Sequence, residues 1–113
     1  MSPPLLVLNT LRNRILRECN IRGYKHGAAV LDRSGNIRAI GINVRGAGYS
    51  SRLSYHAEEM ALIRAARKGG VPRHATLVVA RLNKDGTWGL SKPCNRCEYL
   101  IHEAGIKVVE YTS

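Results

Sequence analysis

The 113-residue sequence predicts one α/β domain spanning residues 1–113, in which about four strands are covered by helices. Three observations lead to this fold class. Apolar residues make up 44% of the chain, enough to give one domain of this length a buried core. Segments with apolar residues at helical spacing alternate with short apolar runs typical of strands. In the second half of the sequence, predicted helices and strands alternate. This alternation favours parallel pairing of the strands, because parallel strands need a crossover connection.

The first half predicts a helix followed by a hairpin. Leu8, Leu11, Ile15 and Cys19 recur three and four residues apart, which indicates a helix over about residues 4–20 with one apolar face. The stretch AAVLDRSGNIRAIGINV then contains two apolar runs around a DRSGN turn, a pattern typical of a β-hairpin. The Gly- and Ser-rich RGAGYSSRLS that follows predicts a loop.

The second half predicts two helices and two strands. In YHAEEMALIRAARKGG, Ala57, Ala61 and Ala65 keep helical spacing, Ser54 is a candidate cap, and two glycines end the helix. ATLVVARL predicts a buried strand, and NKDGTWGLSKP predicts a polar loop. CNRCEYLIHEAG predicts another amphipathic helix and IKVVEY a last strand. The predicted order is α-β-β-α-β-α-β.

Composition narrows the classes of protein. No run of about 18 apolar residues is present and no secretion signal is recognisable, so we expect a cytoplasmic protein without a membrane span. Three cysteines are too few for a disulfide scaffold, and in a reducing compartment a Cys-x-x-Cys pair favours a metal or redox site. The net charge of +10 indicates attraction to phosphate, nucleotides or nucleic acid, although a solvated basic surface explains it equally well.

Four residues carry the candidate chemistry. His56 and the pair Cys94 and Cys97 stand at the predicted starts of helices that adjoin the same strand, and residues i and i+3 of a helix lie on one side. Two thiolates and one imidazole suit Zn²⁺ and leave its fourth position open to water, whose pKa then falls towards roughly 7. Glu58 lies two residues after His56, where a carboxylate could transfer a proton without being a ligand.

This pairing of motifs resembles a known family. His56-Ala57-Glu58 followed by Pro93-Cys94 and Cys97 is similar to the H-x-E and P-C-x-x-C signature of the zinc-dependent cytidine and deoxycytidylate deaminase superfamily, and the order of elements resembles it over nearly the whole chain. The resemblance implies a zinc-dependent hydrolytic deaminase that converts cytosine to uracil. It implies zinc bound by the histidine and both cysteines, and Glu58 as the general acid and base.

The resemblance also implies a three-layer α-β-α sandwich with a mixed sheet and a set of substrate contacts. Asn43, in the AIGIN segment, matches the position where members contact the sugar or base, and the substrate-binding set we expect is Asn43, Tyr55, Ala57 and Pro93. Tyr55 could stack on a base or pack against the sheet. Members usually continue into a fifth strand and further helices, which this minimal sequence lacks after VVEYTS, so we expect an open edge strand and a homo-oligomer that covers it.

Other interpretations of these residues stay open. A structural zinc site would need a fourth ligand, and Cys19, His26, His74 and His102 are the candidates. Trp88 could contact a base or pack in the core. The basic side chains near the motifs could bind a phosphate or be solvated: Arg45, Arg52, Lys92 and Arg96.

Three functions therefore compete at this level. The first is deamination of a cytosine nucleoside or nucleotide, which the motifs favour. The second is editing of cytosine or adenine in single-stranded DNA or tRNA, which the charge favours, although an aromatic content of 5% weakens the case for base stacking. The third is a zinc-stabilised binding module without catalysis, which an intact Glu58 disfavours.

Overall fold

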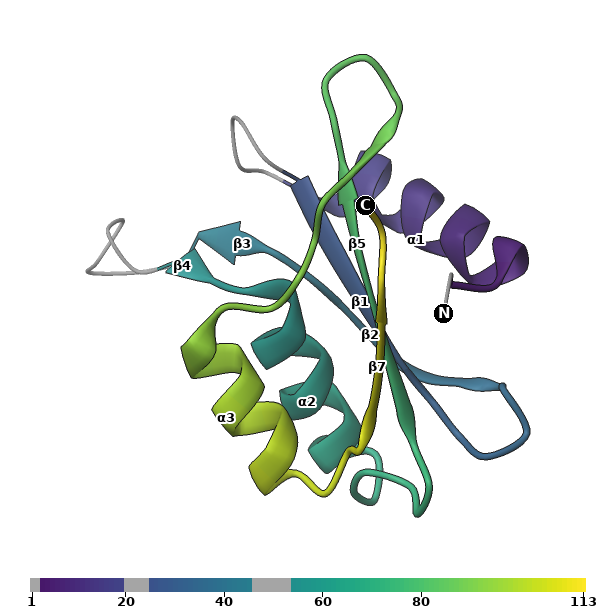
Figure 1. The fold of residues 1–113 in the computed structure, drawn as a ribbon, viewed down its shortest axis with the longest axis vertical. Coiled ribbons are helices and arrows are strands. Elements are labelled where there is room, and N and C mark those ends of the chain that lie inside the picture. The colour runs from purple at the N-terminus through teal and green to yellow at the C-terminus, as the bar shows by residue number, and fades with distance from the viewer. Residues whose placement is uncertain (1–2, 20–24, 46–53) are drawn as a thin grey trace.

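The computed structural model describes residues 3–19, 25–45 and 54–113, which form helices on both faces of one main sheet (Figure 1). The helices are α1 (Leu5–Glu18), α2 (Ala57–Arg67) and α3 (Asn95–Glu103). The strands are β1 (Lys25–Leu31), β2 (Ile37–Ile42), β3 (Val44–Arg45), β4 (Ser54–Tyr55), β5 (Thr76–Leu82), β6 (Trp88–Gly89) and β7 (Val108–Tyr111). This order confirms the predicted succession of three helices and four principal strands.

The main sheet is mixed, as predicted. Strand β1 pairs antiparallel with β2 through the DRSGN turn, which confirms the hairpin, and antiparallel with β5 on its other side. Strand β7 runs parallel to the first half of β5, from Thr76 opposite Val108 to Val79 opposite Tyr111. The α3 crossover between β5 and β7 makes this parallel pairing possible.

The core has two apolar layers because successive side chains of a strand point to opposite faces. Ala28 and Val30 of β1 pack with Ala61 of α2 and Ile101 of α3, whereas Ala29 packs with the buried face of α1 on the other side. The same alternation occurs along β5. The arrangement confirms the three-layer α-β-α sandwich, with α1 on one face and α2 beside α3 on the other (Figure 1).

Two local predictions were wrong. Ser54 does not cap α2, because it pairs with Arg45 in the β3–β4 ladder, and the residue at the N-cap is His56. The segment expected as a polar loop contains β6, whose Trp88 and Gly89 pair with Leu82 and Arg81 and add a fifth, two-residue strand to the main sheet. The predicted loop after the hairpin falls mostly at 46–53, outside the described residues.

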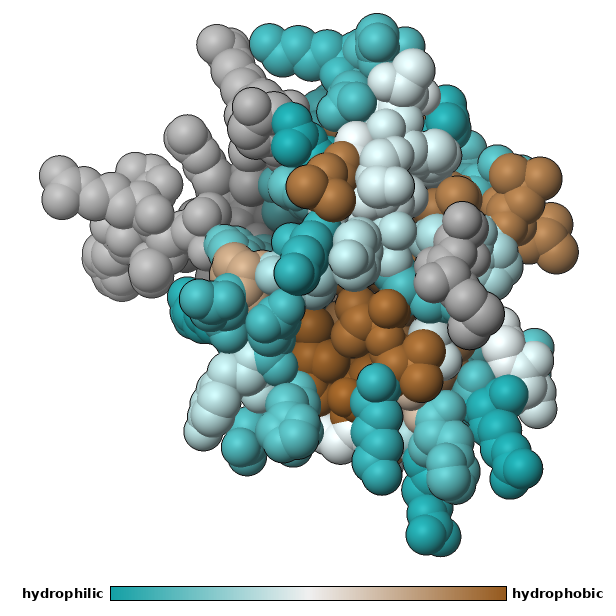
Figure 2. Space-filling model, in the orientation of Figure 1, coloured by the Kyte–Doolittle hydropathy of each residue, from teal (hydrophilic) through white to brown (hydrophobic). Residues whose placement is uncertain are grey.

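Strand β7 lies at an edge of the sheet, as predicted. In the described part of the chain its ladder partner is β5, and its side chains Val108 and Tyr111 are 44% and 37% exposed. Figure 2 shows an apolar area, rimmed by hydrophilic side chains, over the region where Figure 1 draws β7. A second subunit over this edge stays a prediction. No helix among the described residues has the length and apolar character to cross a membrane.

Candidate metal centre

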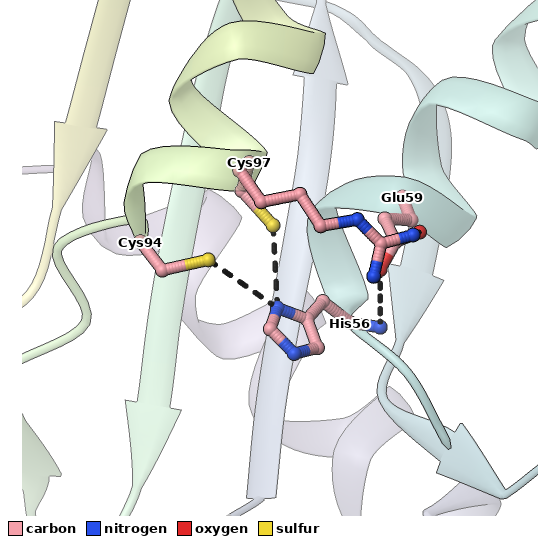
Figure 3. A network of polar contacts seen from close by, with 5 residues as sticks. His56, Glu59, Cys94 and Cys97 are labelled. Carbon is pink, nitrogen blue, oxygen red and sulfur yellow. Dashed lines mark hydrogen bonds and ion pairs between the residues drawn. The ribbon is translucent and has the colours of Figure 1, made fainter. Parts of the chain in front are cut away.

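Three side chains that the sequence singled out converge at one point (Figure 3). The Nδ1 atom of His56 lies 3.2 Å from the Sγ atom of Cys97 and 3.8 Å from that of Cys94. A tetrahedral zinc ion with ordinary bond lengths separates its nitrogen and sulfur ligands by roughly 3.5 Å. The spacing and the donor types therefore fit Zn²⁺.

The starts of two neighbouring helices bring these ligands together. His56 is the N-cap residue of α2 and Cys94 is the N-cap residue of α3, while Cys97 lies one turn further along and is fully buried. Both helices pack on the same face of the sheet, and both begin at the same end of it (Figure 1). Helix starts carry partial positive charge. This charge stabilises the thiolate form of a cysteine and attracts an anion that approaches the site.

The number of ligands bears on the type of site. Among the described residues the group of candidate ligands contains only His56, Cys94 and Cys97. None of the four candidates for a fourth ligand, which include Cys19 and His26, joins it. A structural zinc site is normally closed by four protein ligands, whereas a catalytic site keeps one position open. The set of three favours the catalytic type.

Glu58 is buried beside this cluster, in the first turn of α2. Only 6% of the residue is exposed, and burial raises the pKa of its carboxyl group above the ordinary value. Burial likewise raises the pKa of the Cys97 thiol, and the nearby Glu58 carboxylate adds to this shift. A carboxyl group with a raised pKa is suited to accepting and returning a proton near neutral pH. A cation bound at the cluster would in turn favour the thiolate.

The Asn43 side chain lies in a contact that sequence reasoning did not anticipate. Its Oδ1 atom accepts a hydrogen bond of 2.8 Å from the backbone N–H of His26 and lies 3.4 Å from the Sγ atom of Cys19. Cys19 is half-buried against the α1 side of the core, as predicted, and also reaches Asn43. Asn43 is 8% exposed, so its orientation is set by the end of β2 and its neighbours.

The other predicted substrate contacts lie around the same helix starts. Tyr55 ends β4 immediately before His56, Ala57 is the first residue of α2 and fully buried, and Pro93 precedes Cys94 and is buried. Trp88 lies elsewhere: it packs against the α1 side of the core, where the Arg12 guanidinium stands 5.0 Å from its ring centre. Core packing of Trp88 is therefore confirmed.

Sequence reasoning missed two residues that hold the cysteine-bearing loop. The Ser91 hydroxyl donates to the carbonyl of Val79 at 2.8 Å and lies 2.9 Å from the Thr112 hydroxyl, which in turn bonds the Gly89 carbonyl. Both side chains are buried. They attach the segment before Pro93 to β5 and to the residue after β7. No sequence signal links them, because they stand 21 residues apart in unrelated segments.

Glu59 was also missed, although a local signal existed. It stands three residues after His56, the position at which a carboxylate caps the N-cap N–H of a helix. The wrong assignment of the cap to Ser54 hid this relation. The Glu59 carboxylate accepts the backbone N–H of His56 (Figure 3). It also accepts an N–H of Arg96 of α3.

A cavity elsewhere on the molecule does not belong to this cluster. It has a volume of about 380 Å³ and lies beyond the far ends of α2 and α3, lined by Arg73, His74, Ala75, Gly105, Lys107 and Val108. None of His56, Cys94 and Cys97 lines it. The convergence of donor atoms, rather than cavity size, locates the candidate site.

The chain resembles known deaminases in sequence and in fold. The family model described as the cytidine and deoxycytidylate deaminase zinc-binding region matches residues 9–113. Comparison with curated proteins finds no match. Among solved structures, the chain is similar to a cytidine deaminase from Burkholderia pseudomallei, with a TM-score of 0.67, 24% identity and coverage of 96% of this chain and 83% of that one.

The chain is also similar to two further solved structures. The dCMP deaminase of the cyanophage S-TIM5 gives a TM-score of 0.64 and 21% identity, covering 96% of this chain and 84% of that chain. A diaminohydroxyphosphoribosylaminopyrimidine deaminase/5-amino-6-(5-phosphoribosylamino)uracil reductase from Thermotoga maritima gives a TM-score of 0.52 at 34% identity, covering 76% of this chain but 22% of that larger protein.

Proposed function

The chain belongs to the zinc-binding cytidine and deoxycytidylate deaminase family, which its match over residues 9–113 shows, and from this premise we propose that it hydrolytically deaminates a cytosine nucleoside or nucleotide. The observation that carries the proposal is the convergence of His56, Cys94 and Cys97 beside the buried Glu58. In this reaction water and the amino-substituted ring carbon give a carbonyl group and ammonia.

We assign His56, Cys94 and Cys97 as the zinc ligands and Glu58 as the proton carrier. When bound, zinc supplies a Lewis acid that lowers the pKa of water at its open position. The Glu58 carboxylate takes one proton from the attacking water and delivers it to the ring nitrogen. It then takes the second proton from the hydroxyl group formed on the ring carbon and delivers it to the departing amine. Its burial supports this role, because a raised pKa lets the same group act as base and then as acid.

For substrate recognition we propose Asn43, at the end of β2, and three residues at the helix starts, Tyr55, Ala57 and Pro93. Asn43 presents an amide whose orientation is fixed by His26, and amides recognise sugar hydroxyls or base edges through hydrogen bonds. Ala57 has a small side chain that leaves room for a base near the ligands, and Pro93 holds the backbone before Cys94 rigid. Tyr55 has an aromatic ring that can stack on a base. The family name supports cytidine or deoxycytidylate as the substrate class.

Two observations each favour a different substrate. The net charge of +10 favours a polynucleotide, so that the chain would edit cytosine or adenine in single-stranded DNA or tRNA. The 34% identity to the Thermotoga deaminase/reductase favours a different amino-substituted pyrimidine that carries a ribosyl phosphate. A cytoplasmic location and a homo-oligomer stay predictions that accompany the first proposal.

A panel of substrates tests the proposal. Purified protein is incubated with cytidine, deoxycytidine, their 5′-monophosphates, a phosphoribosylated diaminopyrimidine, and cytosine- or adenine-containing oligonucleotides, and ammonia release is measured at several salt concentrations. We expect turnover of a cytosine monomer with a weak dependence on salt, since one phosphate contact releases few counterions. Turnover confined to oligonucleotides, falling steeply with salt, would replace it with the editing function. Ammonia from none of these compounds would contradict deamination.

A further inference from the structure

The Glu59 carboxylate connects the two chain segments that carry the candidate zinc ligands. Its Oε1 atom accepts the backbone N–H of His56 at 3.3 Å, and its Oε2 atom accepts an N–H of Arg96 at 3.1 Å. The Glu59 side chain is 10% exposed, whereas the Arg96 side chain is 70% exposed. A nearly buried carboxylate is therefore held by one backbone donor and one guanidinium donor.

Both partners of this carboxylate are tied to the ligands by the covalent chain. His56 is itself a ligand, and its backbone N–H is the group that Glu59 binds. Arg96 stands in the first turn of α3, between Cys94 and Cys97. One side chain of α2 thus spans from the backbone of the imidazole ligand to the turn that carries both thiols. The two helices also contribute apolar side chains, such as Ala61 and Ile101, to one core cluster.

We propose that Glu59 and Arg96 form a positioning pair that fixes the separation between the His56 imidazole and the two cysteine sulfurs, and thereby raises the affinity of the site for its metal. The proposal rests on the proposed zinc site, but not on the identity of the substrate. Neither residue touches the metal or the reacting atoms. Residues that hold ligands in place typically change metal affinity by about 10- to 100-fold when they are replaced.

The charge of the pair supports a role beyond capping. Any acceptor at residue 59 could satisfy the His56 N–H, but only a carboxylate can also pair with a guanidinium. The Arg96 end of this ion pair is open to solvent, where charge pairing adds little to folding, and Glu59 keeps its bond to the His56 N–H. Loss of the Arg96 partner should therefore leave overall stability nearly unchanged. A fall in metal affinity without a matching fall in stability is therefore the signature of positioning.

The experiment uses the full chain with cobalt(II) as a spectroscopic probe and zinc in competition with a chromophoric chelator. The variants are Arg96→Gln, Arg96→Lys and Glu59→Gln. Arg38→Gln serves as the matched control, because Arg38 is also a largely exposed arginine that pairs with a more buried carboxylate, Asp32, at 3.5 Å in the β1–β2 hairpin. Thermal unfolding is followed for every protein in zinc and in chelator.

We expect Arg96→Gln and Glu59→Gln to lower zinc affinity about 10- to 100-fold and to shift the thiolate-to-cobalt absorption bands, which report ligand geometry. Arg96→Lys should restore part of the affinity, since it keeps the charge but not the planar fork. Arg38→Gln should match the unmodified protein. In chelator, Arg96→Gln should unfold within about five degrees of the unmodified protein.

Two results would overturn the inference. One is an unchanged zinc affinity and cobalt spectrum in Arg96→Gln, which is the variant least exposed to folding defects. The other is an affinity loss in Arg38→Gln as large as that in Arg96→Gln. Failure of the proposed function would give a different result. The unmodified protein would bind metal with the expected spectrum but would release no ammonia. In that case the effect of the pair on affinity would still be measured.

Discussion

The Nδ1 atom of His56 lies 3.2 Å from the Sγ atom of Cys97, although 41 positions separate the two residues along the chain. Each belongs to the first turn or cap of its own helix, and the strand β5 separates those helices in sequence. Closing so long a loop costs conformational entropy, so a metal held by both ends stabilises the folded chain over the unfolded one. Substitutions that weaken the site should therefore also lower the stability of the metal-bound fold.

Replacement of Cys97 should abolish metal binding. We expect Cys97→Ala to retain less than a tenth of the bound zinc and to lose the rise in unfolding temperature that zinc gives the unmodified protein, because one of three ligands is missing. Metal content and thermal unfolding with and without zinc measure this. Cys19→Ala is the control. Cys19 is a half-buried thiol outside the cluster, so this variant should keep its zinc. A metal-replete, stable Cys97→Ala would refute the ligand assignment.

Replacement of Glu58 should separate chemistry from metal binding. In Glu58→Gln the side chain keeps its size in a buried position, so fold and zinc content should stay as they are. Turnover should fall by at least about 10²- to 10⁴-fold, the usual contribution of a general acid and base. Steady-state ammonia release and metal analysis on the same preparation test this. Activity within tenfold of the unmodified enzyme would remove Glu58 from the mechanism.

Gly41 should tolerate no side chain, because α2 crosses β2 there. A Cβ atom built on Gly41 would overlap the backbones of Ala57 and Ala61 and stand 2.7 Å from the backbone carbonyl carbon of Met60. Backbone cannot move aside cheaply, so Gly41→Ala should lower the unfolding free energy by about 1–3 kcal/mol or more. It should also weaken zinc binding, since α2 carries His56 at its start.

Urea unfolding measures this difference, and Gly27→Ala is the matched control. A Cβ at Gly27 would meet only side-chain carbons of Ile15 and Leu11, at 3.1–3.3 Å. These carbons can adjust, so the control should lose less stability. Equal losses in the two variants would show that the approach of α2 to β2 is not the limiting contact.

His26 should make stability depend on pH. Burial, followed by the charges of Arg81 and His56, lowers the pKa of His26 to about 4, below its ordinary value of 6.5. Below pH 6.5 the unfolded chain takes up this proton while the folded chain does not until about pH 4. The contribution of His26 is therefore fully present above pH 6.5 and is lost as the pH falls towards 4.

Comparison with His26→Gln isolates this contribution, because other titrating groups are common to both proteins. Between pH 7 and pH 4 the unmodified protein should lose about 2 kcal/mol more unfolding free energy than the variant, after allowance for partial solvent screening. Urea unfolding at several pH values gives both curves. Parallel curves would show that His26 is protonated equally in the folded and unfolded states.

The Thr112 hydroxyl should stabilise the loop before the cysteines. In Thr112→Val the shape is kept, but Ser91 Oγ and the backbone N–H of Arg81 lose a partner at 2.9 and 3.1 Å. We expect a loss of about 1–3 kcal/mol in unfolding free energy, the usual cost of removing one partner from buried hydrogen bonds. Thr112→Ser keeps the hydroxyl and should lose less. A Val variant as stable as the Ser variant would contradict this role.

Much of the fold was predictable because apolar periodicity reports which face of each element is buried. The spacing of Leu11 and Ile15 predicted α1, and the alternation of small apolar residues in β1 and β5 fits a sheet covered on both faces. Short polar segments carry no such signal. The two-residue strands β4 and β6 were missed because cross-strand pairing, rather than local pattern, creates them.

The sequence by itself determined the donor set: one imidazole, two thiols at i and i+3 and a nearby carboxylate, whose chemistry and motif spacing point to zinc without any coordinates. Only the tertiary structure decided how these groups are held. The Glu59 bridge from His56 to Arg96, the Ser91–Thr112 contact and the seat of Asn43 between Cys19 and His26 all join segments distant along the chain. Such contacts depend on three-dimensional packing of whole elements, and no local residue pattern encodes which distant side chain will meet which.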